Sequence, residues 1–373
     1  NLLPSGILRE DVVNVMGNGM VIDLAHLCGE MQRLREAGVA VTPERLRISN
    51  RAVICMPYHR QQDCLEEDRL ADAKFGSTRR GIGPVYGDKY MKKALQMGDL
   101  LEPARLKERL ERLVEWKNLT LVGGYGAQAI SVAEMMDWLE TFGAPLRPYL
   151  CDAGAYLAQS ARAGKHILLE AQLGALRDIE FGIYPYTSSS STLAAYAPIG
   201  AGVPGLRVDH VLGIMKAYAT CVGEGPFVCE MHGADAHALR EAGGEYGAAT
   251  GRPRRVGGFD VVASRYGVRM QGADALALTK LDVLSALARI PVCTAYRVDG
   301  GVTYDFPMGG ALERAEPVIE LLDGWQCDIR HCRTEAELPP QARAYIAFLE
   351  RAVACPITYV SVGADREEYF MRS

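Results

Sequence analysis

Short apolar runs alternate with longer segments of helical periodicity along most of this 373-residue chain. Strand-like runs occur at residues 51–56, 166–170, 274–278 and 356–362, whereas apolar residues recur at helical spacing over 23–37. This alternation is typical of a mostly parallel central sheet with helices on both faces, in which ligands bind beyond the carboxyl ends of the strands. The sequence therefore predicts an α/β fold.

Length and composition place the chain among ordinary globular proteins. It is 49% hydrophobic and 23% charged, and its length suffices to bury a large core. We expect residues 1–373 to form one main domain, because α/β enzymes of this size are often built on one continuous sheet. Further helices are predicted at residues 61–74, 89–97, 103–116, 132–142, 152–163 and 208–218.

The charge balance indicates what kind of partner the chain binds, and the cysteines indicate its cellular compartment. A net charge of −5 and a pI near 5.9 give no general attraction to nucleic acid or to an anionic membrane, so we expect a small-molecule partner. Ten cysteines without CxxC pairs are typical of reduced thiols in the cytoplasm. No apolar stretch approaches the ~18 residues of a membrane helix, so we expect a soluble cytoplasmic protein.

The sharpest chemical signal is an apolar strand that ends in Thr279-Lys280-Leu281-Asp282. A carboxylate at this position can accept two parallel hydrogen bonds, which suits the N1–H and N2–H₂ edge of guanine, and adenine lacks that donor pair. The lysine stem can cover the face of the base. The alternative is an ordinary strand end at which Asp282 caps a helix.

A second candidate is the basic loop at residues 247–255, which places three guanidinium groups within four residues. Gly251 bends this loop and Pro253 stiffens it. Arginines held so close together repel one another unless anions lie between them, so we favour binding of phosphate and carboxylate groups over a solvated basic turn.

Two further segments offer hydroxyl and amide donors. Residues 76–84 combine small hydroxyl residues, glycines and two arginines just ahead of a predicted helix, which forms either an anion cradle or a plain turn. The Ser/Thr run at 187–192 follows Tyr184-Pro185-Tyr186, and such runs serve as phosphate donors or, more often, as turns.

Other patterns carry less. Residues 200–205 match GxGxxG by letter, but no clear strand precedes them, so we reject a dinucleotide-binding fingerprint. The chain contains no GxxxxGK[ST] motif. Two groups, one of Cys229, His232 and His237 and one around His331, lack a second cluster at ligand spacing, so we expect no metal site within this chain.

Taken together and in order, seven motifs resemble those of the adenylosuccinate synthetase family, and the resemblance runs from Leu2 to Arg366. They are Leu3-Pro4-Ser5-Gly6-Ile7-Leu8, 77–84 with Tyr86 and Lys89, 178–186 with its Ser/Thr run, Gly225-Pro226-Phe227, 245–260, 279–284 and 361–366. The resemblance implies a P-loop-NTPase-like adenylosuccinate synthetase fold. It also implies a reaction in which GTP phosphorylates the 6-oxygen of IMP and L-aspartate then displaces that phosphate, with Mg²⁺ as cofactor and a homodimer as assembly.

The resemblance also assigns roles to positions of this sequence, and Lys89 matches a lysine of the family motif. The IMP-binding set is Thr78, Lys92, Gln172, Leu173, Ser188 and Arg252. The aspartate-binding set is Ala248, Ala249, Thr250, Gly251, Arg252 and Arg254. The GTP-binding set is Arg254, Lys280, Leu281, Asp282, Ser361, Val362 and Gly363.

The chain departs from the family pattern at several of these positions. Lys92 stands where the family usually has an arginine that reaches the neighbouring subunit's IMP site, so the charge is kept but the bidentate fork is lost. In ungapped register Leu173 replaces a glutamine that contacts IMP, so either Gln172 substitutes for that glutamine or the contact is absent. Ala249 replaces a hydroxyl residue of the aspartate loop.

The largest departure is at the start of the chain, which opens with Asn1 in mid-pattern. The family's glycine-rich phosphate loop, its Asp general base and magnesium ligand, and its His general acid precede the position of Leu2. We therefore expect a truncated chain that is inactive without this N-terminal segment. The alternatives are a non-catalytic nucleotide-binding paralogue and a related synthetase that acts on another purine monophosphate.

Overall fold

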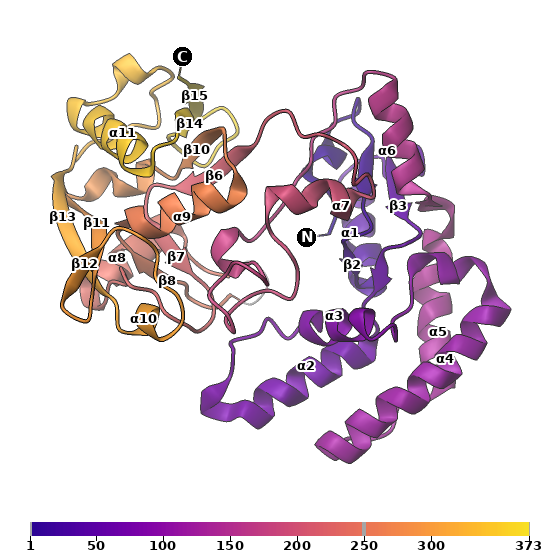
Figure 1. Ribbon diagram of the computed structural model, residues 1–373. Coiled ribbons are helices and arrows are strands. Elements are labelled where there is room, and N and C mark those ends of the chain that lie inside the picture. The colour runs from indigo at the N-terminus through magenta and orange to yellow at the C-terminus, as the bar shows by residue number, and fades with distance from the viewer. Residues whose placement is uncertain (1, 248–250, 373) are drawn as a thin grey trace. The chain divides into compact units, whose positions relative to one another are not determined.

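A computed structural model describes residues 2–247 and 251–372, and in it the chain divides into two compact units (Figure 1). The first unit comprises the described residues up to Gln172, together with Ser188–Ser190 and Tyr196–Arg207. The second comprises Leu173–Thr187, Ser191–Ala195 and the described residues from Val208 onward. The expectation of one main domain over residues 1–373 stays a prediction.

The first unit is built on two small parallel sheets. One has the strand order β1-β3-β5, and β2 pairs with β4 in the other. Their bounds are β1 Asn14–Met16, β2 Val21–Ile22, β3 Leu46–Ser49, β4 Val53–Ile54 and β5 Leu150–Cys151. Strand side chains such as Met16, Ile22 and Ile48 are fully buried, so the sheets lie at the core of this unit.

The helices of the first unit begin at residues that cap their free amides. The Asp23 carboxylate accepts from the His26 amide at the start of α1, and Ser131 and Glu134 form a capping box at α5. The α-helices are α1 Leu24–Glu36, α2 Pro57–Leu70, α3 Ile82–Tyr90, α4 Pro103–Asn118, α5 Val132–Gly143, α6 Ala153–Arg162 and α7 Ala197–Ala201. Shorter turns are η1 Ser5–Leu8, η2 Ala71–Ala73, η3 Met97–Leu101, the π-helix η4 Leu119–Gly124 and η5 Ala144–Tyr149.

The second unit contains the parallel sheet that carries the predicted strand-end motifs. Its strand order is β15-β14-β10-β6, in which β6, β10 and β14 are parallel and β15 is antiparallel. The bounds are β6 Leu212–Lys216, β10 Ala275–Thr279, β14 Ile357–Ser361 and β15 Tyr369–Met371. Helices α9 (Val261–Gln271) and α11 (Pro340–Val353) lie beside this sheet and share its hydrophobic core (Figure 1).

A second sheet of this unit is mostly antiparallel. Strand β11 pairs with β12 and β13 antiparallel and with β9 parallel, while β7 and β8 form a separate antiparallel pair. The bounds are β7 Ala219–Cys221, β8 Arg255–Gly257, β9 Phe259–Asp260, β11 Arg289–Val298, β12 Gly301–Thr303 and β13 Glu316–Asp323. The remaining helices are α8 Gly233–Gly243, α10 Gly310–Glu313, η6 Ala175–Arg177, η8 Asp282–Ala286 and η9 Glu335–Glu337, and η7 spans Ala194–Tyr196.

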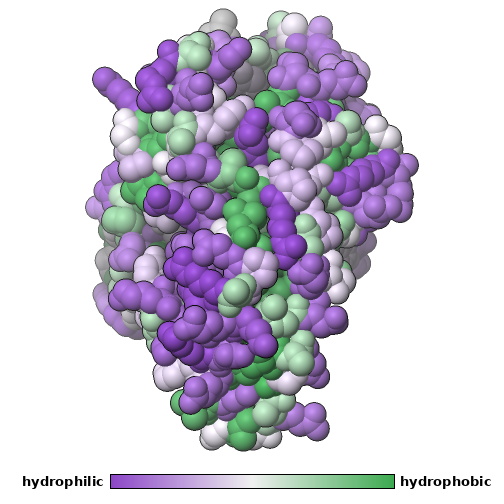
Figure 2. Space-filling model, turned by 90° about the vertical axis from the view of Figure 1, so that its right-hand side faces the viewer, coloured by the Kyte–Doolittle hydropathy of each residue, from purple (hydrophilic) through white to green (hydrophobic). Residues whose placement is uncertain are grey.

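The predicted α/β class is confirmed, and most predicted elements are present. Helices predicted at 23–37, 103–116, 132–142 and 152–163 correspond to α1, α4, α5 and α6, and the strands predicted at 51–56, 274–278 and 356–362 contain or match β4, β10 and β14. The helix predicted at 61–74 begins and ends about four residues earlier, as α2. Figure 2 shows hydrophilic side chains over most of the face that it presents, with smaller apolar patches between them.

Three predicted elements are wrong. The helix at 89–97 is instead the end of α3, because Lys92 adopts a left-handed φ of 61° that stops helical continuation. The helix at 208–218 contains strand β6, since pairing with β10 overrides its helical spacing. Within the described residues, the strand at 166–170 finds no neighbouring strand and stays irregular, with Leu168 91% exposed.

Candidate functional sites

The carboxyl ends of three neighbouring strands bring most of the predicted GTP-binding residues together. Thr279, the last residue of β10, pairs with Lys216, the last residue of β6. On the other side β10 pairs with β14, which ends at Ser361. Lys280 and the residues that follow Ser361 therefore lie at the same edge of one sheet, which is where open parallel sheets bind ligands.

The side chain at the centre of this edge is Glu245, which the sequence analysis did not single out. Its carboxylate is 1% exposed and accepts hydrogen bonds from Lys216 Nζ at 2.8 and 2.9 Å, from Lys280 Nζ at 3.0 Å and from the Tyr218 hydroxyl at 2.6 Å. Arg254 Nη1 lies 3.3 Å from the same carboxylate. One buried anion thus holds three cations together.

The ionisation of Glu245 follows from these partners. Burial alone would raise the pKa of the carboxyl, but hydrogen bonds from Lys216, Tyr218 and Lys280 outweigh burial and lower the pKa to about 2. Burial also lowers the pKa of the Lys216 ammonium, against the opposing effect of Glu245. Since the cluster contains one carboxylate and three cations, its net charge is positive, and that charge favours an anionic ligand.

The basic loop is closed at its base by backbone hydrogen bonds. Arg254 N donates to Glu245 O at 2.9 Å and Gly247 N donates to Arg252 O at 2.8 Å, so the loop returns to its starting point. Gly251 has a φ of 64°, which glycine adopts without strain. The predicted aspartate residues Ala248, Ala249 and Thr250 lie outside the described residues.

The arginines of this loop have different environments. Arg252 is exposed, whereas Arg254 is partly buried against Glu245. Arg255 donates to Glu230 Oε2 at 2.9 Å and to Gly225 O at 2.8 Å, so it fixes the segment around Gly225. Arg252 and Arg254 remain the loop's candidates for anion binding.

Asp282 begins η8, two residues beyond Lys280. Burial raises the pKa of its carboxyl, and the neighbouring Glu368 raises it further, while Lys280 and Arg330 oppose the rise. Lys280 itself has a left-handed φ of 60°, and its ammonium donates to Glu245 and to Gly243 O. The ammonium group of Lys280 is therefore held by Glu245 and Gly243. Only the aliphatic stem of this lysine remains available to a ligand at the strand end.

The loop after β14 lies against the strand end of β10. Leu281 N donates to Ser361 O at 3.4 Å, and Ser361 Oγ donates to Gly363 O at 2.9 Å. The side chains of Leu281 and Val362 are fully buried, so only their backbone groups can face a ligand. A Cβ on Gly363 would lie 1.9 Å from Glu368 Oε2, which explains the glycine.

In the first unit, the predicted IMP loop before α3 is held by two carboxylates of α2. Asp63 accepts from Ser77 Oγ at 2.6 Å and from Gly81 N at 2.7 Å, and Glu67 accepts from Gly76 N at 3.2 Å. These bonds fix both ends of the loop and leave the Thr78 side chain exposed between them.

Hydroxyl groups of the Ser run lie at the first turn of α3. A Cβ on Gly83 would be 3.8 Å from Ser189 Oγ, and Ser188 Oγ lies 3.3 Å from Ser190 Oγ. Lys89 lies on the same helix with its Nζ 5.5 Å from the Tyr86 ring centroid, and burial lowers the pKa of its ammonium.

The other predicted IMP residues are exposed. Lys92 and Gln172 are exposed residues of the first unit. Leu173, assigned to the second unit, is 59% exposed and has a φ of 78°.

A buried charged network that the sequence analysis missed links α3 to the neighbouring helices α2 and α4. Asp88 Oδ2 lies 2.6 Å from Lys117 Nζ and 3.0 Å from His59 Nε2, and all three side chains are almost fully buried. His59 Nδ1 accepts from Met56 N, so Nε2 carries the proton and donates to Asp88. No local pattern marks this network, because its members come from three helices.

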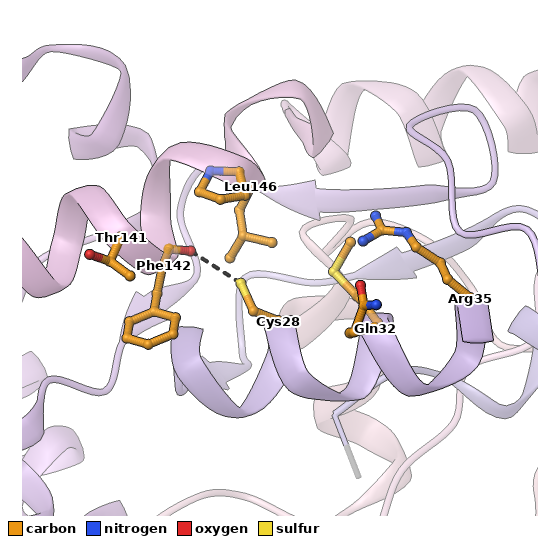
Figure 3. A pocket seen from close by; sticks show the side chains of 8 residues that line it. Cys28, Gln32, Arg35, Thr141, Phe142 and Leu146 are labelled. Carbon is orange, nitrogen blue, oxygen red and sulfur yellow. Dashed lines mark hydrogen bonds between the residues drawn. The ribbon is translucent and has the colours of Figure 1, made fainter. Parts of the chain in front are cut away.

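A cavity of about 310 Å³ lies elsewhere in the first unit, beside α1 (Figure 3). Cys28 donates to the Phe142 carbonyl there at 3.3 Å, and Arg35 donates to Tyr149. The cavity is lined by Cys28, Met31, Gln32, Arg35, Thr141, Phe142, Pro145 and Leu146. None of the predicted site residues contributes to it.

Residues 2–247 and 251–372 contain no group of three or more His, Cys, Asp and Glu side chains arranged to hold a metal ion. Within the same ranges no helix has the length and apolar character needed to cross a membrane.

Parallel strands whose carboxyl ends gather lysines, a buried carboxylate and a basic loop are typical of α/β proteins that bind an anionic ligand at this edge. The sequence pattern of the adenylosuccinate synthetase family matches residues 1–370, and this chain belongs to that family. Members of the family are ligases of purine biosynthesis that use Mg²⁺ and form adenylosuccinate from IMP, aspartate and GTP.

Individual relatives show how far the similarity extends. The chain is 41% identical to an adenylosuccinate synthetase of Caldanaerobacter subterraneus over 99% of its own length and 86% of the relative's. It is 43% identical to adenylosuccinate synthetase 2 of Pseudoalteromonas translucida, covering 99% and 87% of the two chains.

Solved structures agree. A fully ligated adenylosuccinate synthetase from Plasmodium falciparum has a TM-score of 0.93 at 32% identity, covering 100% of this chain and 87% of the other. A cyanophage S-2L succinoaminodeoxyadenylate synthetase has a TM-score of 0.57 at 19% identity over 99% of this chain and 79% of the other, a likeness of fold alone. The predicted adenylosuccinate synthetase fold is thereby confirmed.

Proposed function

We propose that GTP binds this chain at the carboxyl ends of β6, β10 and β14, and that Asp282 reads the guanine base. The observation that carries this proposal is the position of Lys280 and Asp282 directly after β10, beside the Ser361–Gly363 loop. The Asp282 carboxylate accepts two hydrogen bonds from the guanine edge, and adenine offers no such donor pair. The Lys280 stem covers the base while its ammonium stays with Glu245.

IMP, in this proposal, is held by the first unit through its phosphate. Thr78 presents a hydroxyl from the loop that Asp63 fixes, and Ser188 presents another beside Ser189, whose hydroxyl lies near the first turn of α3. The amides of that turn and the Lys89 ammonium add positive charge, which suits an anion at the start of a helix. Gln172, one position before Leu173 in the sequence, takes the role of the family's glutamine in this proposal.

The aspartate substrate is assigned to the basic loop, with Arg252 and Arg254 as its carboxylate partners. A guanidinium forms two parallel hydrogen bonds to a carboxylate, which gives orientation as well as affinity. Orienting the amine of aspartate toward the activated carbon of IMP removes much of the entropic barrier to the joining step. Thr250 belongs to this proposal by family resemblance, outside the described residues.

The proton transfers of the reaction are not assigned to any described residue. Resemblance to the family predicts that the general base, the general acid and the magnesium ligands precede Leu2, and this stays a prediction. When bound, Mg²⁺ supplies charge neutralisation for the transferring phosphate. A chain of residues 1–373 should bind GTP yet form no adenylosuccinate, and turnover by that chain would disprove the prediction.

Substituting Asp282→Asn in the full-length protein tests the guanine assignment. One acceptor oxygen becomes a donor and the charge is lost, so GTP affinity should fall by about ten- to a hundredfold while ATP affinity changes little. Competition of GTP and ATP for a fluorescent GDP analogue measures both affinities. The matched control is Asp235→Asn, which removes an exposed carboxylate of α8. Equal losses for GTP and ATP would sink the assignment.

Two finer points also belong to this proposal. A homodimer in which Lys92 reaches the neighbouring subunit's IMP site is consistent with the exposed Lys92 side chain, and sedimentation of the protein with and without IMP tests it. The exposed Leu173 motivates the alternative acceptor, another purine monophosphate. Comparing IMP with other purine monophosphates as substrates shows which of them is the acceptor.

A further inference from the structure

We propose that Glu245 is a positioning residue of the guanine-nucleotide site, which acts by anchoring the head of Lys280 and the guanidinium of Arg254. This inference rests on the proposed GTP site. Glu245 touches no part of that site's ligand in this proposal. It sets where the two cations stand, and Lys216 completes its coordination.

The geometry gives Glu245 control over Lys280. The Lys280 ammonium donates to only two described acceptors, the Glu245 carboxylate at 3.0 Å and the Gly243 carbonyl. Its backbone holds a φ of 60°, which is strained for a residue with a side chain and persists only where surrounding contacts fix it. Without the carboxylate, the ammonium would lose its main partner and the stem its fixed direction.

Glu245 also holds the base of the basic loop twice. Its backbone carbonyl accepts from Arg254 N at 2.9 Å, and its side chain lies 3.3 Å from Arg254 Nη1. The position of the Arg254 guanidinium, and with it the end of the loop, is therefore coupled to the same carboxylate that holds Lys280.

The third cation explains why a buried carboxylate can serve two partners. Lys216 lies within 2.9 Å of both Glu245 oxygens, and its ammonium also donates to Thr220 Oγ1. Tyr218 adds a neutral donor at 2.6 Å, so the carboxylate has hydrogen-bond partners besides Lys280 and Arg254 that hold it in place. Lys216 comes from the neighbouring strand, so the cluster joins two strands and the loop.

The test compares GDP and IMP binding to the full-length protein by calorimetry. Glu245→Gln keeps the shape of the side chain and removes its charge. We expect GDP affinity to fall by about tenfold, as for the loss of a charge-assisted hydrogen bond, with IMP affinity changed by less than about twofold. The matched control, Glu241→Gln, neutralises an exposed carboxylate at the end of α8 and should leave both affinities unchanged.

A double-mutant cycle with Lys280→Met distinguishes positioning from a general structural role. If Glu245 acts through Lys280, the double variant should lose less GDP affinity than the product of the two single losses. Fully additive losses, or equal losses of GDP and IMP affinity, would overturn the inference. Should Glu245→Gln fold poorly, Tyr218→Phe removes one donor to the carboxylate and should weaken GDP by about two- to threefold.

The outcome for Asp282→Asn separates this inference from the proposed site. If Asp282→Asn lowers GTP affinity selectively but Glu245→Gln leaves GDP affinity unchanged, the inference fails while the guanine site stands. If neither variant affects guanine nucleotides, both fail.

Discussion

Single residues with unusual backbone conformations occur in both candidate sites. Lys280 at the strand end of β10 and Arg79 in the predicted IMP loop have left-handed φ angles of 60° and 56°. Arg79 N donates to Ser77 Oγ at 3.0 Å, and its side chain pairs with Asp68 at 2.6 Å. At both positions, local hydrogen bonds hold a conformation that side-chain-bearing residues rarely adopt.

Comparing two substitutions of Arg79 measures this strain. Both Arg79→Gly and Arg79→Ala lose the exposed ion pair with Asp68, but only glycine relieves the left-handed backbone. We therefore expect the Gly variant to be more stable than the Ala variant by about 1 kcal/mol. Urea unfolding of the two variants checks the difference, and an Ala variant of equal or greater stability would contradict it.

The residue scale also shows what a single sequence can reveal. The segment Thr279-Lys280-Leu281-Asp282 is recognisable from sequence because a strand end and a chemical motif coincide within seven residues. Glu245 gives no such signal, since its partners Lys216 and Lys280 are about thirty residues away on either side and only the fold brings them together. Spacing along the chain therefore predicts the Thr279–Asp282 motif but not Glu245, the residue that holds Lys280 in place.

At the scale of elements, α2, α3 and α4 are joined by a buried charged network. Lys117 on α4 and His59 on α2 both contact Asp88 on α3, the helix that follows the predicted IMP loop. Removing one partner of a buried ion pair leaves the other charge uncompensated, which costs more than the loss of a surface pair.

Substituting Lys117→Met tests the network. We expect the free energy of unfolding to fall by about 3 kcal/mol or more, because Asp88 would remain buried with His59 alone. The matched control on the same helix is the exposed Lys107→Met, which should change it by less than about 0.5 kcal/mol. Chemical denaturation measures both, and similar effects would show that the network does not stabilise α3.

The buried His59 is expected to make the protein less stable at acidic pH. Burial lowers the pKa of the imidazole, despite the opposing effect of Asp88, so the folded protein binds its proton less readily than the unfolded chain. The stability due to this group is present above the unfolded pKa of about 6.5 and is lost as the pH falls through the lower folded value. Thermal unfolding of His59→Gln and of the unsubstituted protein at pH 7.5 and 5.5 should therefore show a smaller loss in the variant. An equal loss would assign the dependence to other groups.

Predicted elements were reliable where local and tertiary preferences agreed. The helices α1, α4, α5 and α6 have strong amphipathic periods, and the strands β10 and β14 are short apolar runs bounded by turn residues. The predictions of a helix at 208–218 and of a strand at 166–170 were wrong for the same reason. Whether a segment pairs as a strand depends on a neighbour that is distant in sequence. Pairing with β10 makes residues 212–216 a strand, and no described strand does so for 166–170.

For the whole molecule, family membership and fold class were accessible from sequence, and the described residues divide into two compact units. The assigned ligands fall into two groups by unit. Thr78, Ser188 and Lys89 belong to the first, and the strand ends of β6, β10 and β14 belong to the second. IMP and the guanine nucleotide are thus expected to stabilise different parts of the chain.

Hydrogen exchange of the full-length protein tests that distribution. Ligands that bind a folded segment slow the opening of its amides, so IMP alone should protect residues 76–90 and 188–190. GDP alone should protect residues 212–216, 279–286 and 361–363, since these surround the strand ends. The π-helix η4 and α5, which hold no assigned ligand residue, serve as internal controls. Protection of residues 279–286 by IMP alone, at a level equal to that given by GDP, would contradict the assignment of the guanine site to these strand ends.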